Sequence, residues 1–297
     1  MSRLELERLL EGFANATTGS DFTVANARRG WYAFTEDFAI PDDVALAADP
    51  DGETRLEWVQ SHGSTPNRAV LFLHGGGYLC GSARSHRVIA CDLSRSLPVA
   101  VASLDYRLAP EHPYPAALVD ALRAFDAILE RGFTPQRIAI AGDSAGGGLV
   151  LTLLLELKQR GRALPGAGWC ISPWFDLSQR VERLNTNRVR DPIVFTPVLN
   201  ASALIYLNGH SPTDPLVAPL TAELHGLPPL LLQVGSGELL LDDSLGMATA
   251  AAAADVDVTL EVWPQMLHAW HLFARQLSEG RAATRVAAAW LDRKLAP

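Results

Sequence analysis

The clearest chemical pattern in this chain is Gly142-Asp143-Ser144-Ala145-Gly146, in which one serine lies between two glycines. An apolar run at 137–143 precedes the serine, and a helix pattern at 145–159 follows it. G-x-S-x-G between a strand and a helix predicts a sharp turn with the serine at its apex. The N–H groups that begin the helix then face the serine. We therefore expect Ser144 to be a nucleophile; the alternative is a glycine-rich turn whose serine caps a helix.

A second glycine stretch, Gly75 to Gly77, follows His74 and the apolar run at 68–74. Attack by a serine on a carbonyl creates a negative oxygen, which main-chain N–H groups can stabilise where no side chain blocks their approach. We expect these donors from Gly75 and Gly76, with another from Ala145. The alternatives are a flexible turn and a phosphate cradle, although the stretch lacks the G-x-G-x-x-G pattern of dinucleotide sites.

A serine nucleophile needs a base, and histidine suits this role because its ordinary pKa is about 6.5. In chains with this type of turn the order is serine, acid, histidine. His268 lies in the loop after the last predicted strand, at 256–263. We expect it to be the base. His271 is the alternative, but its position in the following helix pattern favours a packing role.

The acid should follow the penultimate predicted strand, in the segment QVGSGELLLDDS. Glu238 comes directly after this strand and its Gly-Ser-Gly turn, so we expect it to orient His268. Asp242 and Asp243 are the alternatives. Both precede a helix pattern, where acidic side chains commonly stabilise the helix N-terminus.

Apolar runs and helix patterns alternate along most of the chain. Six nearly continuous apolar runs predict strands buried on both faces, at 68–74, 98–106, 137–143, 166–172, 228–236 and 256–263. In the run at 54–61, apolar and polar residues alternate more regularly than in the other six, which predicts an antiparallel strand near the sheet edge. Helix patterns lie at 85–97, 116–131, 145–159, 244–254 and 279–294. The sequence thus predicts an α/β fold with a mostly parallel central sheet flanked by helices.

Two segments interrupt this alternation, at 1–45 and 178–212. The first is rich in aromatic residues, and the second holds a further helix pattern. Insertions on the loop side of a parallel sheet commonly cover the site. We expect these segments to form a small helical cap, and residues 46–177 and 213–297 to form the catalytic domain.

The bulk composition narrows the class of partner and compartment. Among 297 residues, 25 Lys and Arg stand against 33 Asp and Glu, so a nucleic-acid surface is not expected. The most apolar segment, 149–157, is far shorter than the ~20 residues of a membrane span and contains Glu156. The three cysteines have no metal-like spacing, and no signal peptide is evident. We expect a cytoplasmic protein.

Several motifs together resemble one known family. They are HGGG at 74–77, DYRLAPEHPYPAA at 105–117, GDSAG at 142–146, SPWFDLS at 172–178 and DPLVAPL at 214–220. Over roughly residues 51–297 the chain resembles the bacterial hormone-sensitive-lipase-like (family IV) esterases of the α/β-hydrolase fold. The resemblance implies ester hydrolysis, an oxyanion hole in the HGGG loop and a lid-like cap. It also implies framework roles for Asp143 and for Arg107 and Glu111, as an ion pair or hydrogen-bond support. The family acid is usually aspartate, where this chain has Glu238.

The sequence therefore predicts a serine carboxylesterase that hydrolyses short-chain acyl esters through Ser144, His268 and Glu238 and an acyl-enzyme intermediate. A small ester is the expected partner, and neither a cofactor nor a metal is required. Two alternatives stay open: an amide or lactone hydrolase with the same machinery, and a non-catalytic ligand-binding protein of this fold. The oligomeric state, a homodimer included, is not determined by the sequence.

Overall fold

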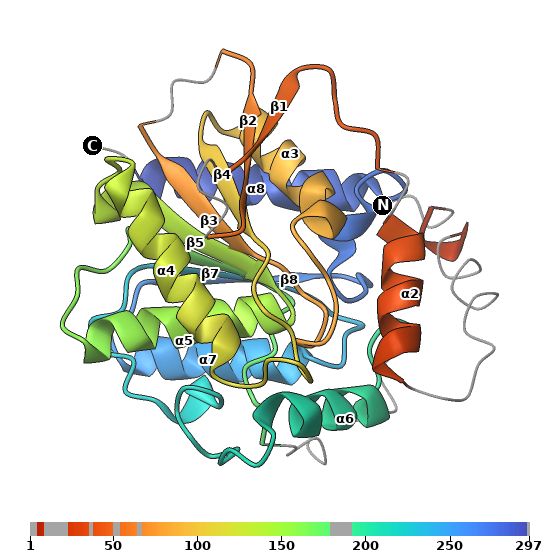
Figure 1. Ribbon diagram of the computed structural model, residues 1–297, viewed down its shortest axis with the longest axis vertical. Coiled ribbons are helices and arrows are strands. Elements are labelled where there is room, and N and C mark those ends of the chain that lie inside the picture. The colour runs from red at the N-terminus through yellow and green to blue at the C-terminus, as the bar shows by residue number, and fades with distance from the viewer. Residues whose placement is uncertain are drawn as a thin grey trace.

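A computed structural model describes residues 5–8, 23–35, 38–49, 54–63, 67–178 and 192–295. One eight-stranded sheet, in the order β1-β2-β4-β3-β5-β6-β7-β8, lies between helices on both faces (Figure 1). The strands are β1 Val44–Ala48, β2 Leu56–Ser61, β3 Ala69–Leu73, β4 Ala100–Leu104, β5 Ile138–Asp143, β6 Ala167–Ile171, β7 Leu230–Gly235 and β8 Val258–Trp263. The predicted α/β class is confirmed.

The helices follow the predicted patterns closely. They are α2 Val24–Thr35, α3 Arg87–Ser96, α4 Ala116–Glu130, α5 Ala145–Gln159, α6 Thr196–Leu207, α7 Leu241–Ala253 and α8 Ser278–Lys294. Two short 3₁₀ helices, η1 Arg84–His86 and η5 Trp270–Phe273, matter for the site. α2 and α6 lie in the two segments expected to form the cap. Within those segments, residues 1–4, 9–22, 36–37 and 179–191 lie outside the described residues.

The sheet is parallel from β4 through β3 and β5 to β8, while β2 pairs antiparallel with β4. The prediction of an antiparallel strand at 54–61 is confirmed. A further strand, β1, pairs antiparallel with β2 and was not predicted. Its sequence, VALAA, has a buried valine but little else that distinguishes it from a loop.

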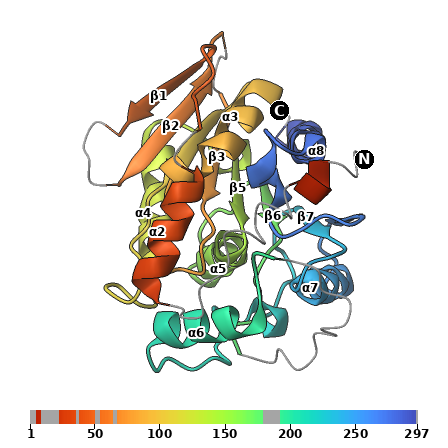
Figure 2. The same cartoon turned by 90° about the vertical axis from the view of Figure 1, so that its right-hand side faces the viewer.

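Successive side chains along the inner strands pack alternately into two apolar cores, one on each face of the sheet. Leu71 and Ile140 belong to the core shared with α4, α5 and α7, whereas Val70 and Phe72 belong to the core shared with α3 and α8. Figure 2 shows α5 and α7 on one side of the sheet and α3 and α8 on the other. Because both faces are covered, the inner strands are apolar almost throughout.

The carboxyl ends of the parallel strands converge on one edge of the sheet. The segment after β3 begins with His74, β5 leads into Ser144, and β6 leads into Ser172. The loops after β7 and β8 carry Glu238 and His268. Ligand sites of parallel α/β sheets form at this edge, so the fold gathers the predicted residues from distant parts of the chain.

Candidate active site

Ser144 lies at the apex of the turn between β5 and α5. Its backbone has φ 54° and ψ −121°, a conformation that non-glycine residues rarely adopt. The turn is held because the Ser144 N–H donates to the carbonyl of Ile171 over 2.8 Å. A Cβ on Gly146 would overlap the carbonyl oxygen of Leu73, which explains the glycine two positions after the serine. Strained backbone that its surroundings hold in place is common at functional positions.

Glu238 and His268 contact each other beside this turn. His268 Nδ1 lies 3.0 Å from Glu238 Oε2, and both side chains are buried. The other carboxylate oxygen accepts the N–H of Gly235 over 2.6 Å and the hydroxyl of Ser172 over 2.7 Å. The carboxylate is therefore fixed on one side and free to orient the imidazole on the other.

Ser172 is a site residue that the sequence reasoning missed. Its hydroxyl donates to Glu238 and accepts the N–H of Ala269 over 2.9 Å, so it joins the acid to the loop that carries His268. Its backbone has φ 44°, in the left-handed region. The available signal was its place at the end of a buried strand, in the same edge position as the other site residues.

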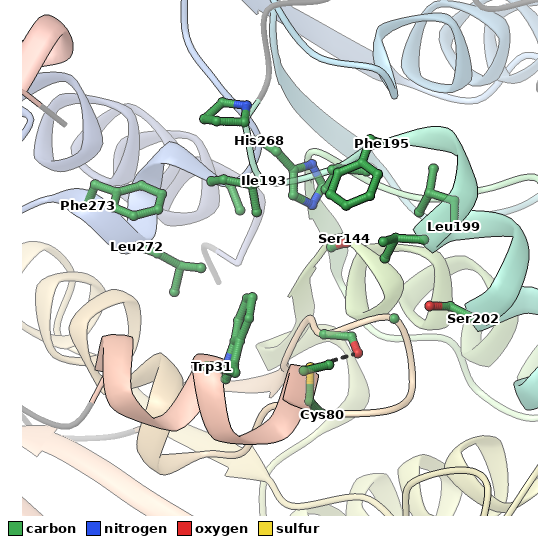
Figure 3. A pocket seen from close by; sticks show the side chains of 18 of the residues that line it. Trp31, Cys80, Ser144, Ile193, Phe195, Leu199, Ser202, His268, Leu272 and Phe273 are labelled. Carbon is green, nitrogen blue, oxygen red and sulfur yellow. Dashed lines mark hydrogen bonds between the residues drawn. The ribbon is translucent and has the colours of Figure 1, made fainter. Parts of the chain in front are cut away.

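A pocket of about 810 Å³ opens above Ser144 and His268 (Figure 3). In Figure 3, Leu199 and Ser202 of α6 lie on one side of Ser144, and Leu272 and Phe273 lie on the other. Trp31 of α2 forms part of the wall. Apolar side chains therefore lie on two sides of the serine. A pocket with mostly apolar walls and few polar groups suits an apolar ligand that carries one reactive group.

The glycine loop also reaches this pocket. Gly76 and Gly77 line it, and within the described part of the chain neither N–H has a hydrogen-bond acceptor. The Gly75 N–H, expected as an oxyanion donor, is directed elsewhere: it donates to Asp143 Oδ1 over 2.9 Å. The reason is steric, since the absence of a side chain at Gly75 lets the Asp143 carboxylate pack against its backbone.

Asp242 and Asp243, the alternative acids, lie in the first turn of α7 as predicted. Asp243 is partly buried and accepts the N–H groups of Phe175 and Asp176 over 2.7 and 3.1 Å. Burial raises the pKa of the Asp243 carboxyl to about 7. Its hydrogen bonds support the loop after β6, and no contact joins it to His268 in the described structure.

His271, the alternative base, is buried in η5 between tryptophans. Its Nε2 lies 2.9 Å from Gln233 Oε1, and its ring lies 4.3 Å from that of Trp270 and 5.9 Å from that of Trp169, between centroids. Burial lowers the pKa of His271 to about 3, so the ring is neutral. These contacts give it the packing role that the sequence favoured.

Arg107 and Glu111 both form framework ion pairs, but not with each other. Arg107 binds Asp120 over 2.8 Å, and Glu111 binds Arg28 of α2 over 2.6 Å. Of the two expected roles, an ion pair or hydrogen-bond support, an ion pair between these two residues is not formed, because Glu111 lies toward the N-terminal helix, a neighbour that the motif alone does not reveal.

Two features are absent from the described residues. No group of three or more His, Cys, Asp or Glu side chains there is arranged to hold a metal ion. Across the same residues, no helix has the length and apolar character needed to cross a membrane. The three cysteines, Cys80, Cys91 and Cys170, are unpaired and buried.

Comparisons with known proteins show the family to which the chain belongs. A family model described as the alpha/beta hydrolase fold matches residues 70–272. An acetyl-hydrolase from Streptomyces hygroscopicus is 44% identical over 251 residues, covering 84% of this chain and 82% of that protein. The crystal structure of an esterase from the bacterial hormone-sensitive lipase family has a TM-score of 0.94 at 40% identity, over 100% of both chains. A crystal structure of EstE5 soaked with p-nitrophenyl butyrate has a TM-score of 0.92 at 37% identity, over 99% of both chains. The chain therefore belongs to the α/β-hydrolase family, among the esterases similar to bacterial hormone-sensitive lipases.

Proposed function

We propose that this chain is a serine carboxylesterase in which Ser144, His268 and Glu238 act together on short-chain acyl esters. The observation that carries the proposal is the convergence of a strained serine and a carboxylate-bound histidine on one apolar pocket. A ligand-binding protein without catalysis would have no need for this buried Glu238–His268 contact.

Ser144 Oγ would attack the ester carbonyl while His268 Nε2 accepts its proton. Glu238, bound to Nδ1, fixes the ring so that Nε2 is the nitrogen available to the serine, and it stabilises the imidazolium that forms. His268 then returns the proton to the leaving alcohol, and an acyl-Ser144 ester remains. A water molecule, activated by His268 in the same way, hydrolyses that ester and releases the acid. The residues described supply each proton transfer without a cofactor.

The developing oxyanion would be held by the N–H groups of Gly76, Gly77 and Ala145. Gly76 and Gly77 line the pocket, and within the described chain their N–H groups have no hydrogen-bond acceptor. Ala145 is the first residue of α5, where N–H groups have no partner within the helix. We propose Gly77 in place of Gly75, since the Gly75 N–H is already bound to Asp143.

Substrate choice would depend on the walls that α2 and α6 contribute. We propose that residues 1–45 and 178–212 form the cap of the catalytic domain, because Trp31, Leu199 and Ser202 come from these segments and enclose the serine. An apolar pocket of about 810 Å³ favours a small ester over a long lipid chain. The names of two similar proteins are in line with this choice, one being an acetyl-hydrolase and one having been soaked with p-nitrophenyl butyrate.

A panel of 4-nitrophenyl esters tests the proposal. We expect kcat/KM to be highest for the acetate, butyrate or hexanoate and to fall steeply for the laurate and palmitate. Ser144→Ala is the matched control, and its rate should be about 10⁶-fold lower than that of wild type for every ester. A δ-lactone and a 4-nitroanilide in the same panel separate ester hydrolysis from the lactone and amide alternatives. A higher kcat/KM for either of these than for all esters would contradict the proposal.

A further inference from the structure

Asp143 connects the nucleophile turn to the glycine loop. It directly precedes Ser144, and its fully buried carboxylate accepts the N–H of Gly75 over 2.9 Å. Burial by itself would raise the pKa of the Asp143 carboxyl, but the neighbouring His86 holds that pKa below the ordinary value. The carboxylate therefore stays charged, and its position fixes the residue before Gly76 and Gly77.

His86, at the end of η1, is the partner of this buried carboxylate. Its Nε2 lies 3.3 Å from Asp143 and 3.2 Å from the Gly75 nitrogen, and its side chain has no solvent exposure. Its Nδ1 lies 2.9 Å from the hydroxyl of Ser85. The proposed mechanism uses neither His86 nor Ser85, so these contacts need another explanation.

The N-terminal helix α2 completes this series. Trp31 Nε1 donates to the Ser85 hydroxyl over 3.1 Å, and the Trp31 ring stacks on His86 with centroids 5.7 Å apart. The Ser85 hydroxyl donates to the carbonyl of Ser82 over 2.9 Å, and its oxygen lies 2.9 Å from Nδ1 of His86. Side-chain contacts therefore run from Trp31 through Ser85 and His86 to Asp143. Arg28 adds a second connection, since its Nε donates to the carbonyl of Leu79 in the glycine loop over 2.8 Å.

We propose that His86 is a positioning residue, which holds the Asp143 carboxylate against Gly75 and thereby fixes the N–H groups of Gly76 and Gly77 that face the substrate oxygen. Ser85 and Trp31 connect this arrangement to α2, so the N-terminal helix supports the oxyanion loop as well as walling the pocket. His86 lies behind the loop and is absent from the described pocket lining, so it acts on the transition state through the loop and not on substrate binding. This inference rests on the proposed function.

Two substitutions at this position test the proposal. His86→Phe keeps a ring against Trp31 but removes both nitrogens, whereas His86→Gln keeps a donor that can reach Asp143. A displacement of oxyanion donors by a fraction of an ångström to 1 Å costs about tenfold to a hundredfold in rate. We expect kcat of His86→Phe to fall by this factor with KM within about threefold, and His86→Gln to recover most of the loss. Hydrogen–deuterium exchange of residues 74–81 should be faster in His86→Phe than in wild type.

His271→Phe is the matched control, because it also removes a buried histidine but one that packs between tryptophans. It should lower the melting temperature without changing kcat or exchange in 74–81. Equal kcat in wild type and folded His86→Phe would overturn the proposal, as would an equal loss in His271→Phe. If His86→Phe does not fold, Ser85→Ala decides: a severalfold lower kcat supports the proposal, and an unchanged kcat overturns it. A wild-type protein inactive on all esters would refute the proposed function, while the exchange data would still decide the role of His86.

Discussion

The family resemblance implies aspartate where this chain has Glu238, and the surroundings of Glu238 explain how a longer side chain can contact His268. Ser172 and Gly235 hold Oε1 from one side, so that Oε2 faces His268 Nδ1 at 3.0 Å. The extra methylene is accommodated by buried hydrogen bonds, and the carboxylate orientation depends on more than the acid itself.

The identity of the acid can be tested by comparing three amide substitutions. Glu238→Gln should lower kcat by about 10⁴-fold, because an amide at this position no longer fixes the required tautomer of the histidine. Asp242→Asn and Asp243→Asn should each lower kcat by less than about tenfold, since neither contacts His268 in the described structure. Steady-state hydrolysis of 4-nitrophenyl butyrate at pH 7.5 measures all three. The greatest loss in Asp242→Asn or Asp243→Asn would show that the acid is misassigned.

Ser172→Ala tests the support for the acid. The substitution leaves the Ala269 N–H and one lone pair of Glu238 without a partner in a buried place, which costs about 1–3 kcal/mol of stability. Because the Glu238–His268 orientation also loosens, we expect kcat to fall about tenfold or more with KM nearly unchanged. Urea unfolding and steady-state kinetics measure the two effects. Lower stability with an unchanged kcat would reduce Ser172 to a structural role.

The site residues that can be predicted from the sequence are those that belong to short sequence patterns. The serine turn requires glycines at fixed offsets, and the expected acid and base follow predicted strands in a known order, so Ser144, Glu238 and His268 could be named as candidates. Ser172 and the Asp143–Gly75 bond could not, because each contact joins segments far apart in the chain. The Gly75 expectation failed for this reason: only the folded chain shows where its N–H points.

At the scale of elements, the central strands and their helices were predictable. Strands buried on both faces have continuous apolar runs, and such runs alternating with helix patterns indicate a parallel sheet covered by helices. β1 was missed because an edge strand buries only part of its surface and carries a weak pattern. The aromatic residues of the N-terminal segment contribute to both the core and the pocket. Trp31 and Phe38 pack against the core shared with α3 and α8, and Trp31 also lines the pocket. Phe13, Phe22 and the Phe34 side chain lie outside the described part.

The contribution of α2 to selectivity can be separated from its contribution to stability. Trp31→Ala removes both core packing and a pocket wall, whereas Phe38→Ala removes core packing from a residue absent from the described pocket lining. Both variants should melt at lower temperature. Only Trp31→Ala should change the ratio of kcat/KM for hexanoate and acetate esters, because only it enlarges the space beside Ser144. The same ratio in wild type and Trp31→Ala would contradict a substrate-facing role for α2.

At the scale of the whole molecule, buried titratable groups make stability depend on pH in opposing ways. Burial lowers the pKa of His74 and of His271 to about 3. Below pH 6.5 the unfolded chain binds protons at these rings that the folded chain does not, so stability falls as the pH drops from about 6.5 toward 3. Asp243 has the opposite sign. Its pKa is raised to about 7, so the folded chain keeps a proton that the unfolded chain has lost, and stability falls as the pH rises from about 4 to 7.

Asp243→Asn isolates the second effect. The amide oxygen can still accept the N–H groups of Phe175 and Asp176, but it carries no proton that is lost in this range. The free energy of unfolding of the variant, relative to wild type, should therefore increase between pH 4.5 and pH 7.5. Urea unfolding at the two pH values gives this difference. A difference that is equal at both values, or smaller at pH 7.5, would contradict the raised pKa.

The central claim is that Ser144 is the nucleophile, and covalent labelling tests it most directly. A fluorophosphonate should inactivate the wild-type protein in proportion to the incorporation of one adduct, and peptide mass spectrometry should locate that adduct on Ser144. Ser144→Ala should incorporate none, and its hydrolysis of 4-nitrophenyl butyrate should be lower by about 10⁶-fold with an unchanged circular dichroism spectrum. An adduct on another residue that accompanies inactivation, or Ser144→Ala activity within tenfold of wild type, would contradict the account.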